Sequence, residues 1–129
     1  PPSRIPDNTD IYIVNAYGKT KPFYNYCKNV FLGGSIINHG GQNPLEAARF
    51  DCNILHGPNV SNFKEIYAFL NKNKISSKIS SSKMMTELLI NFFSKNRNSN
   101  KIKGKINIIG QKILNVTYKE INLLLKNEL

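Results

Sequence analysis

The segment between residues 33 and 46 contains the residues of this chain best suited to bind an anionic ligand. Two glycine pairs, at 33–34 and 40–41, precede Asn43-Pro44, a pattern that favours a helix start with Asn43 as N-cap and Pro44 in the first turn. Glycines allow a ligand close to the backbone, and free N–H groups at a helix start favour a phosphate. Glu46, within the first turn, can accept hydrogen bonds from a ribose diol.

The same residues also have a purely structural interpretation. The spacing of Asn43 and Glu46 matches a capping box, in which the glutamate folds back onto the N-cap backbone. The loop fits neither the GxGxxG fingerprint of dinucleotide folds nor the GxxxxGK[ST] loop of nucleoside triphosphatases. We favour nucleotide binding because the glycines stand between a predicted strand and a predicted helix.

Three further polar side chains accompany this loop. His39 lies between the glycine pairs and His56 follows a predicted strand, so either imidazole can hydrogen-bond to a phosphate, although loop histidines are more often solvated. Ser35 can donate to a phosphate or stabilise a turn, and the turn is favoured. Because the sequence has no His, Cys or carboxylate cluster with metal-site spacing, we expect neither metal nor cofactor.

Short apolar runs alternate with helical patterns between residues 11 and 95. The predicted strands are 11–15, 29–34, 53–57 and part of 74–80, and the predicted helices lie within 17–27, 43–51, 62–71 and 82–95. This order indicates an α/β fold, a Rossmann-like parallel sheet with helices on both faces. Ligands of such sheets bind at the carboxyl ends of the strands, so the loops after residues 15, 34 and 57 should share one rim.

The C-terminal third reads as helical. The helix at 82–95 has an apolar stripe that we expect to be core, consisting of Met84, Met85, Leu88, Leu89, Phe92 and Phe93. Residues 94–105 are predicted to form a polar basic connector with Gly104 as a helix breaker. One or two closing helices follow from Ile106.

The length and the charge limit the class of protein. The 129 residues fit one domain, and 18 Lys and Arg against 8 Asp and Glu give a net charge of +10. This charge suits an anionic membrane surface or a nucleic acid, but the aromatic residues are scattered rather than interleaved with lysine, which disfavours a nucleic-acid platform. Without a long uncharged stretch, the chain is expected to be a soluble piece, with any membrane anchor elsewhere.

Residues 30–67 closely resemble the C-terminal half of the 3-deoxy-D-manno-octulosonic acid (Kdo) transferases, the lipid A glycosyltransferases of Gram-negative bacteria. The likeness combines GGS after a strand, the GGQNPLE helix start and the GPN-x-x-NF-x-x-I segment, in that order. A weaker match extends back to Ile11 and forward to the C-terminus. The resemblance implies the C-terminal half of a GT-B glycosyltransferase, with residues 1–129 as the domain that binds the donor CMP-Kdo and the N-terminal acceptor domain absent from this chain.

The resemblance also implies which residues contact the nucleotide. They are Tyr17, Gly18 and Lys19 in a first loop and Asn43, Pro44, Leu45 and Glu46 at the helix start, in addition to the loop residues Gly33, Gly34, Gly40 and Gly41. Kdo transferases usually have Gly-Glu where this chain has Gly18-Lys19. We predict that the Lys19 ammonium meets the phosphate or the sugar carboxylate of the donor, since a cation suits an anion.

For the whole enzyme, the resemblance implies transfer of Kdo from CMP-Kdo to lipid IVA in lipopolysaccharide biosynthesis, without a metal, at the cytoplasmic face of the inner membrane. The catalytic base of such enzymes is a glutamate of the N-terminal domain, so we expect this fragment to be inactive alone. Two other functions remain open. One is a GT-B domain that uses a UDP-sugar, and the other is a stand-alone module that binds nucleotide or nucleic acid.

Overall fold

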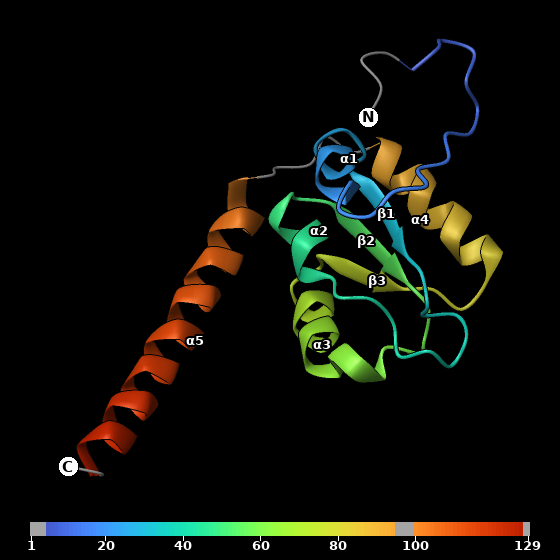
Figure 1. Ribbon diagram of the computed structural model, residues 1–129. Helices are drawn as coiled ribbons and strands as arrows, with labels where there is room; N and C mark the ends of the chain where they lie inside the picture. The colour runs from blue at the N-terminus through green and yellow to red at the C-terminus, as the bar shows by residue number, and fades with distance from the viewer. Residues whose placement is uncertain (1–4, 95–99, 128–129) are drawn as a thin grey trace. The chain divides into compact units, whose positions relative to one another are not determined.

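The computed structural model describes residues 5–94 and 100–127 of the chain. The chain divides into two units, Pro1–Lys95 and Asn96–Leu129. The first unit is an α/β structure, and the second consists of one long helix, α5 (Asn100–Asn127; Figure 1). Within the described residues, no helix combines the length and apolarity needed to span a bilayer.

The first unit is built on a parallel sheet of three strands in the order β1-β2-β3. These strands are β1 (Asn29–Leu32), β2 (Asn53–His56) and β3 (Ser76–Lys78), with Val30 opposite Ile54 and Leu55 opposite Ser77. All three coincide with predicted strands, and the predicted α/β class with a parallel sheet is confirmed. Their carboxyl ends therefore share one rim, as expected of parallel strands.

Two helices connect the strands and complete the core. Helix α2 (Leu45–Arg49) contacts β2, and α3 (Lys64–Lys72), preceded by the short 3-10 turn η1 (Ser61–Phe63), contacts β3. Ala47 and Ala48 are fully buried, because small side chains let α2 approach the sheet closely. The other fully or nearly fully buried apolar side chains are Cys52, Ile54, Leu55, Tyr67, Leu70 and Ile75.

The remaining two helices of this unit are less buried. Helix α1 (Thr20–Tyr26) contacts α2, and α4 (Ser82–Ser94) lies on the side of the sheet away from α3 (Figure 1). The prediction that the apolar stripe of α4 is core holds only in part, since Met85, Leu88, Leu89 and Phe92 are half-buried, no residue of this helix is fully buried, and Phe93 is largely exposed. Helical spacing identifies an apolar face but does not show what covers it.

The predicted strand at 11–15 was wrong. These residues have no strand assignment in the described part of the chain, and Ile11 and Ile13 are exposed. Tyr12 instead places its ring 6.1 Å from that of Phe23 on α1. A run of alternating apolar residues specifies a strand only when a neighbouring strand pairs with it.

Gly104 was predicted to be a helix breaker within the connector at 94–105, but it lies inside α5, which continues without a break to Asn127. A single glycine costs a helix only about 1 kcal/mol relative to alanine, which the surrounding helix formers offset. The structure therefore has one closing helix. Residues 95–99 of the predicted connector lie outside the described residues.

Candidate functional site

The backbone conformation of the loop between β1 and α2 requires glycine at three of its four glycine positions. Gly34, Gly40 and Gly41 have φ of +66°, +89° and +76°, values that side-chain-bearing residues rarely adopt. The N–H of Gly41 donates to Gly34 O at 3.0 Å and closes the loop. These three glycines were predicted to admit a ligand, but the turn itself already requires them.

The second glycine pair is also packed tightly against the loop that follows β2. A Cβ on Gly40 would overlap the side chain of Asn62, and one on Gly41 would lie 3.2 Å from Asn59 O. Gly33 differs, because a Cβ there would meet no other heavy atom within 4 Å in the described structure. Of the four glycines, Gly33 is thus the one with space in front of its backbone.

Ser35 was a candidate phosphate donor, and the structure contradicts this role. Its side chain is fully buried, and its hydroxyl donates to Leu32 O at 2.6 Å while accepting the N–H of Gly57 at 2.9 Å. The N–H of Asn59 donates to Ser35 O at 2.9 Å. Ser35 therefore ties the loop after β1 to the loop after β2, and its hydroxyl hydrogen is already used.

The two histidines have different positions. His56 is buried, with Nδ1 2.7 Å from Gly57 O, Nε2 3.3 Å from Asn71 Oδ1 and its ring 4.3 Å from that of Tyr67. It therefore packs in the core, and its candidacy as a ligand residue is withdrawn. His39 is exposed on the loop, close to Gly34 (a Cβ there would lie 3.1 Å from His39 Cδ2), and stays a candidate.

Helix α2 starts one residue later than predicted, because Pro44 and not Asn43 is its N-cap residue, but the Asn43 side chain still binds a backbone N–H there. Asn43 Oδ1 accepts the N–H of Leu45 at 3.0 Å, and the first helical bond runs from Ala48 N–H to Pro44 O. Pro44 has helical dihedrals and is buried. The Asn43 side chain thus accepts a hydrogen bond from one of the N–H groups that a helix start leaves without an internal partner. The N–H of Glu46 also comes before the first helical hydrogen bond.

The side chain of Glu46 points away from Asn43. Its Oε2 accepts a hydrogen bond from the Thr20 hydroxyl at 3.2 Å, and its Oε1 lies 3.8 Å from Lys21 Nζ. The side chain is 42% exposed. The capping-box interpretation of Glu46 is therefore wrong, and its carboxylate joins the start of α2 to the start of α1.

The first loop itself is open. Tyr17 and Lys19 are exposed, and Gly18 has φ of +70° with no heavy atom of the described residues within 4 Å of a Cβ placed there. Burial raises the pKa of the nearby Tyr24 phenol, and the charges of Glu46 and Cys52 raise it further. A hollow of about 260 Å³ beside α1 is lined by Val14, Ala16, Lys19, Thr20, Phe23 and Tyr24.

Residues that the sequence reasoning missed complete the rim. Thr20 and Lys21 contact the Glu46 carboxylate, and the sequence signal that could have identified them is their position directly after Lys19.

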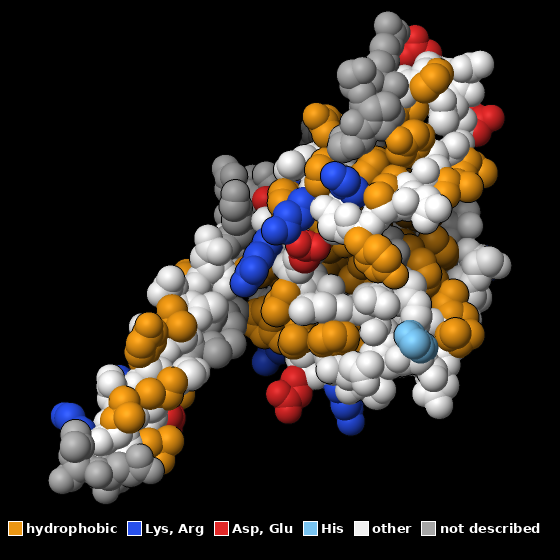
Figure 2. Space-filling model, in the orientation of Figure 1, with side chains coloured by type: hydrophobic (Ala, Val, Ile, Leu, Met, Phe, Trp, Pro, Cys, Tyr) orange, Lys and Arg blue, Asp and Glu red, His pale blue; other side chains and the backbone are white. Residues whose placement is uncertain are grey.

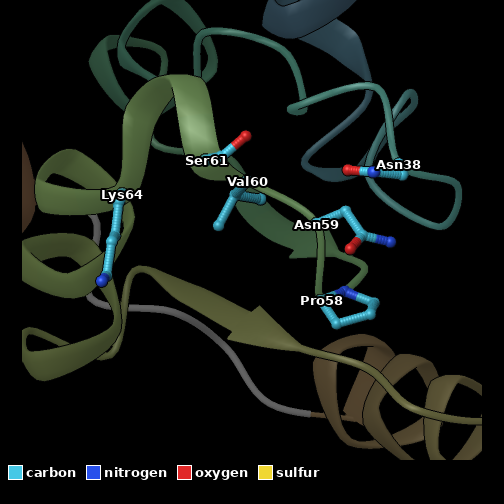
Figure 3. Close-up of a pocket in the computed structure, with 6 residues that line it drawn as sticks. All are labelled: Asn38, Pro58, Asn59, Val60, Ser61 and Lys64. Carbon is cyan, nitrogen blue, oxygen red and sulfur yellow. The ribbon is translucent and has the colours of Figure 1, made fainter.

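A second hollow of about 260 Å³ lies between the loops after β1 and β2 (Figure 3), lined by Asn38, Pro58, Asn59, Val60, Ser61 and Lys64. In residues 5–94 and 100–127, no group of three His, Cys, Asp or Glu residues is placed to hold a metal ion.

The comparisons with known proteins agree on one family. The chain is 34% identical over 64 residues to a 3-deoxy-D-manno-octulosonic acid transferase of Haemophilus influenzae, covering 50% of this chain and 15% of that protein. It is 33% identical over 89 residues to the enzyme of the same name from Rickettsia prowazekii, covering 69% and 19%. The chain is related to the Kdo transferases. It spans less than a fifth of the length of these two relatives, and no family model matches it.

A solved structure shares this fold. The crystal structure of the C-terminal CMP-Kdo binding domain of WaaA from Acinetobacter baumannii superposes with a TM-score of 0.68 at 18% identity, covering 80% of this chain and 54% of that one. At this identity the superposition establishes the fold. Together with the sequence matches, it relates the chain to the C-terminal domain of a Kdo transferase.

Proposed function

We propose that this chain supplies donor-binding residues of a Kdo transferase and that its ligand is CMP-Kdo. The relatives are named as Kdo transferases, and the structural neighbour is named as a CMP-Kdo binding domain. The domain proposed for residues 1–129 is the donor half of the enzyme, and the acceptor half belongs to a part of the protein that this chain does not contain.

The observation that carries the proposal is the position of the Glu46 carboxylate between the start of α2 and the start of α1, directly after the first loop. It is partly exposed, so one oxygen can exchange its contact with Lys21 for a ribose hydroxyl. The N–H of Glu46 lies at the start of α2, and the backbone of Gly33 lies in the loop that leads to it. Both groups can face the phosphate. Because α2 has only five residues, these local N–H groups contribute more than a helix dipole.

Two lysines at the start of α1 provide the charge. Lys19, at the N-cap position of α1, and Lys21, in its first turn, are both exposed. Their ammonium groups can neutralise the phosphate and the carboxylate of a CMP-linked sugar acid. Tyr17 and Gly18 precede them on the open loop and can contact the nucleotide through side chain and backbone.

The chemistry proposed for the whole enzyme is inverting transfer. A general base deprotonates the acceptor hydroxyl, which attacks the anomeric carbon of Kdo as CMP leaves with the bonding electron pair. We assign that base, and the lipid IVA acceptor, to the part of the enzyme outside this chain. The role of the present residues is to position the donor and to stabilise the departing phosphate, so the chain alone should bind CMP and transfer nothing.

The test is a titration of the chain with CMP, followed by NMR chemical-shift mapping. We expect shifts at residues 17–21 and 33–46, weaker binding for Lys19→Glu, and wild-type binding for Lys72→Glu, an exposed lysine at the end of α3. Preference for UDP over CMP would indicate a UDP-sugar enzyme. A broad response to oligonucleotides with a steep dependence on salt, without a CMP response, would indicate a nucleic-acid module and overturn the proposal.

A further inference from the structure

The hollow between the loops after β1 and β2 contains polar side chains that the proposed nucleotide contacts do not use (Figure 3). Its volume of about 260 Å³ is below the range of drug-sized ligand sites and suits a single sugar ring. Pro58 and Val60 give it an apolar part, and its polar lining residues are Asn38, Asn59, Ser61 and Lys64.

Three of these polar side chains have no hydrogen bond or ion pair with the residues that the structure describes. They are the Asn38 amide, the Ser61 hydroxyl and the Lys64 ammonium, and all three are exposed. The Asn59 amide donates to Ile36 O at 2.8 Å, which leaves its own oxygen as an acceptor. Figure 3 shows the Asn38 amide directed toward the side of the hollow where Ser61 lies. Amides and hydroxyls both donate and accept, as sugar hydroxyls require of their partners.

Lys64 adds a positive charge at the edge of the hollow. It is the first residue of α3, where the helix dipole disfavours a cation, so the stability of the helix does not explain it. None of the described lining residues is acidic. In Figure 3 the Lys64 side chain extends along α3, and its flexible four-carbon stem allows the ammonium to turn over the hollow. An anion there would meet a positive charge without a competing carboxylate.

The hollow adjoins the glycine loop that leads to α2. A Cβ on Gly41 would lie 3.2 Å from Asn59 O, and the N–H of Asn62 donates to Gly40 O at 3.2 Å. The wall of the hollow and the second glycine pair are therefore in direct contact. Glu46, the proposed ribose ligand, follows shortly after this pair. A donor whose ribose lies at Glu46 can extend along the glycine loop and place its sugar in the hollow.

We propose that this hollow binds the sugar acid of the donor, with Lys64 on the carboxylate and with Asn38 and Ser61 on ring hydroxyls. The inference rests on the proposed function and assigns residues to the Kdo part of CMP-Kdo. A neutral sugar would leave the ammonium without a partner, so Lys64 favours a sugar acid. Figure 2 shows basic side chains in two separate areas of the first unit, one over α1 and α2 and one near α3. The first area, with Lys19 and Lys21, is left to the phosphate.

The test compares CMP, which has no sugar acid, with freshly prepared CMP-Kdo in NMR titrations of the 129-residue chain. Only CMP-Kdo should shift the backbone amides of residues 59–64. Lys64→Gln should bind CMP-Kdo about tenfold more weakly than the wild type and bind CMP equally well. Lys64→Arg keeps the charge and should restore most of the affinity for CMP-Kdo. Lys72→Gln, at an exposed lysine of the same helix, is the matched control and should change neither affinity.

The hydroxyl contact is tested by Ser61→Ala, which should weaken binding of CMP-Kdo and leave binding of CMP unchanged. The proposal is overturned if CMP and CMP-Kdo bind with equal affinity, or if Lys64→Gln and Lys72→Gln have the same effect. A loss in Lys64→Gln that is equal for both ligands also overturns it. If the wild type binds no CMP, the proposed function fails, and free Kdo decides about the hollow. Shifts of residues 59–64 that Lys64→Gln abolishes would then support the sugar-acid site, and no shift would overturn it.

Discussion

Thr20 and Glu46 connect two segments that are far apart in the sequence, because the Thr20 hydroxyl donates to Glu46 Oε2 at 3.2 Å. Through this bond and the neighbouring Lys21, the start of α1 and the start of α2 form one surface. In the alternative capping-box interpretation, the same carboxylate would have folded back onto the backbone of Asn43. Its outward orientation is what makes Glu46 available to a ligand.

The first prediction concerns this carboxylate. Glu46→Gln should weaken CMP binding about tenfold to a hundredfold, because a neutral amide makes weaker hydrogen bonds to a ribose diol than a carboxylate does. The measurement is isothermal titration calorimetry of the chain with CMP. Glu65→Gln is the matched control, since Glu65 also lies in the first turn of a helix and is exposed. Equal affinities for the two variants would remove Glu46 from the proposed site.

The second prediction compares alanine substitutions at two glycines, Gly57 and Gly33. Gly57→Ala should lower the free energy of unfolding by about 3 kcal/mol, because the new Cβ would overlap the backbone of Ser35. Gly33→Ala should leave the stability nearly unchanged, since its Cβ would point into open space, yet it should weaken CMP binding if the donor approaches that backbone. Urea unfolding gives the stabilities. A stable Gly57→Ala protein would contradict the close approach of the two loops.

The third prediction concerns the Ser35 hydroxyl. Ser35→Ala should cost about 1–3 kcal/mol, because it leaves the buried N–H of Gly57 without its acceptor. Ser61→Ala, at an exposed serine of η1, should change the stability by less than about 0.5 kcal/mol. Thermal unfolding followed by circular dichroism compares the two. If both substitutions are equally mild, Ser35 does not brace the loops.

The fourth prediction is a loss of stability in alkali. Burial, together with the smaller effect of the nearby Tyr24, raises the pKa of Tyr67 to about 12, and the Tyr67 hydroxyl donates to Gln42 O at 2.9 Å. The folded state therefore holds this proton more tightly than the unfolded state, whose tyrosine titrates near pH 10. The contribution is complete below pH 10 and is lost as the pH rises toward 12, by up to about 2 kcal/mol.

Urea unfolding at pH 9 and at pH 11.5 measures this loss. Tyr67→Phe is the control, because it has no phenolic proton to lose and should show a smaller change between the two values of pH, although it is less stable at both. An equal change in wild type and variant would show that other groups, such as the lysines, cause the alkaline loss.

The sequence predicted the parts of the fold that depend on local pattern. The strands at 29–34 and 53–57 and the helices between them have apolar residues at the right period and turn residues at their ends, and the structure contains them. The expected strand at 11–15 and the buried stripe of α4 depended on what lies beside them. A local pattern does not contain that information, so the expected strand is absent and the stripe of α4 is half-buried rather than core.

The same difference between local and distant contacts explains which parts of the candidate site could be predicted. The cap made by Asn43 could be predicted because it involves residues two apart. The partner of Glu46 could not, since Thr20 is 26 residues away in the sequence. His56 and Ser35 had suitable chemistry at a suitable place in the sequence, but the structure uses their hydrogen bonds internally, which only the packing of two loops could reveal.

The bonds of Ser35 to both neighbouring loops have a mechanical consequence. Segments 33–44 and 57–62 cannot open separately, because any displacement of one breaks hydrogen bonds that the other also needs. A nucleotide that binds there would meet a preorganised surface, so the protein would lose little conformational entropy on that side. The adjustment to each ligand would instead come from residues 17–19, whose side chains face solvent.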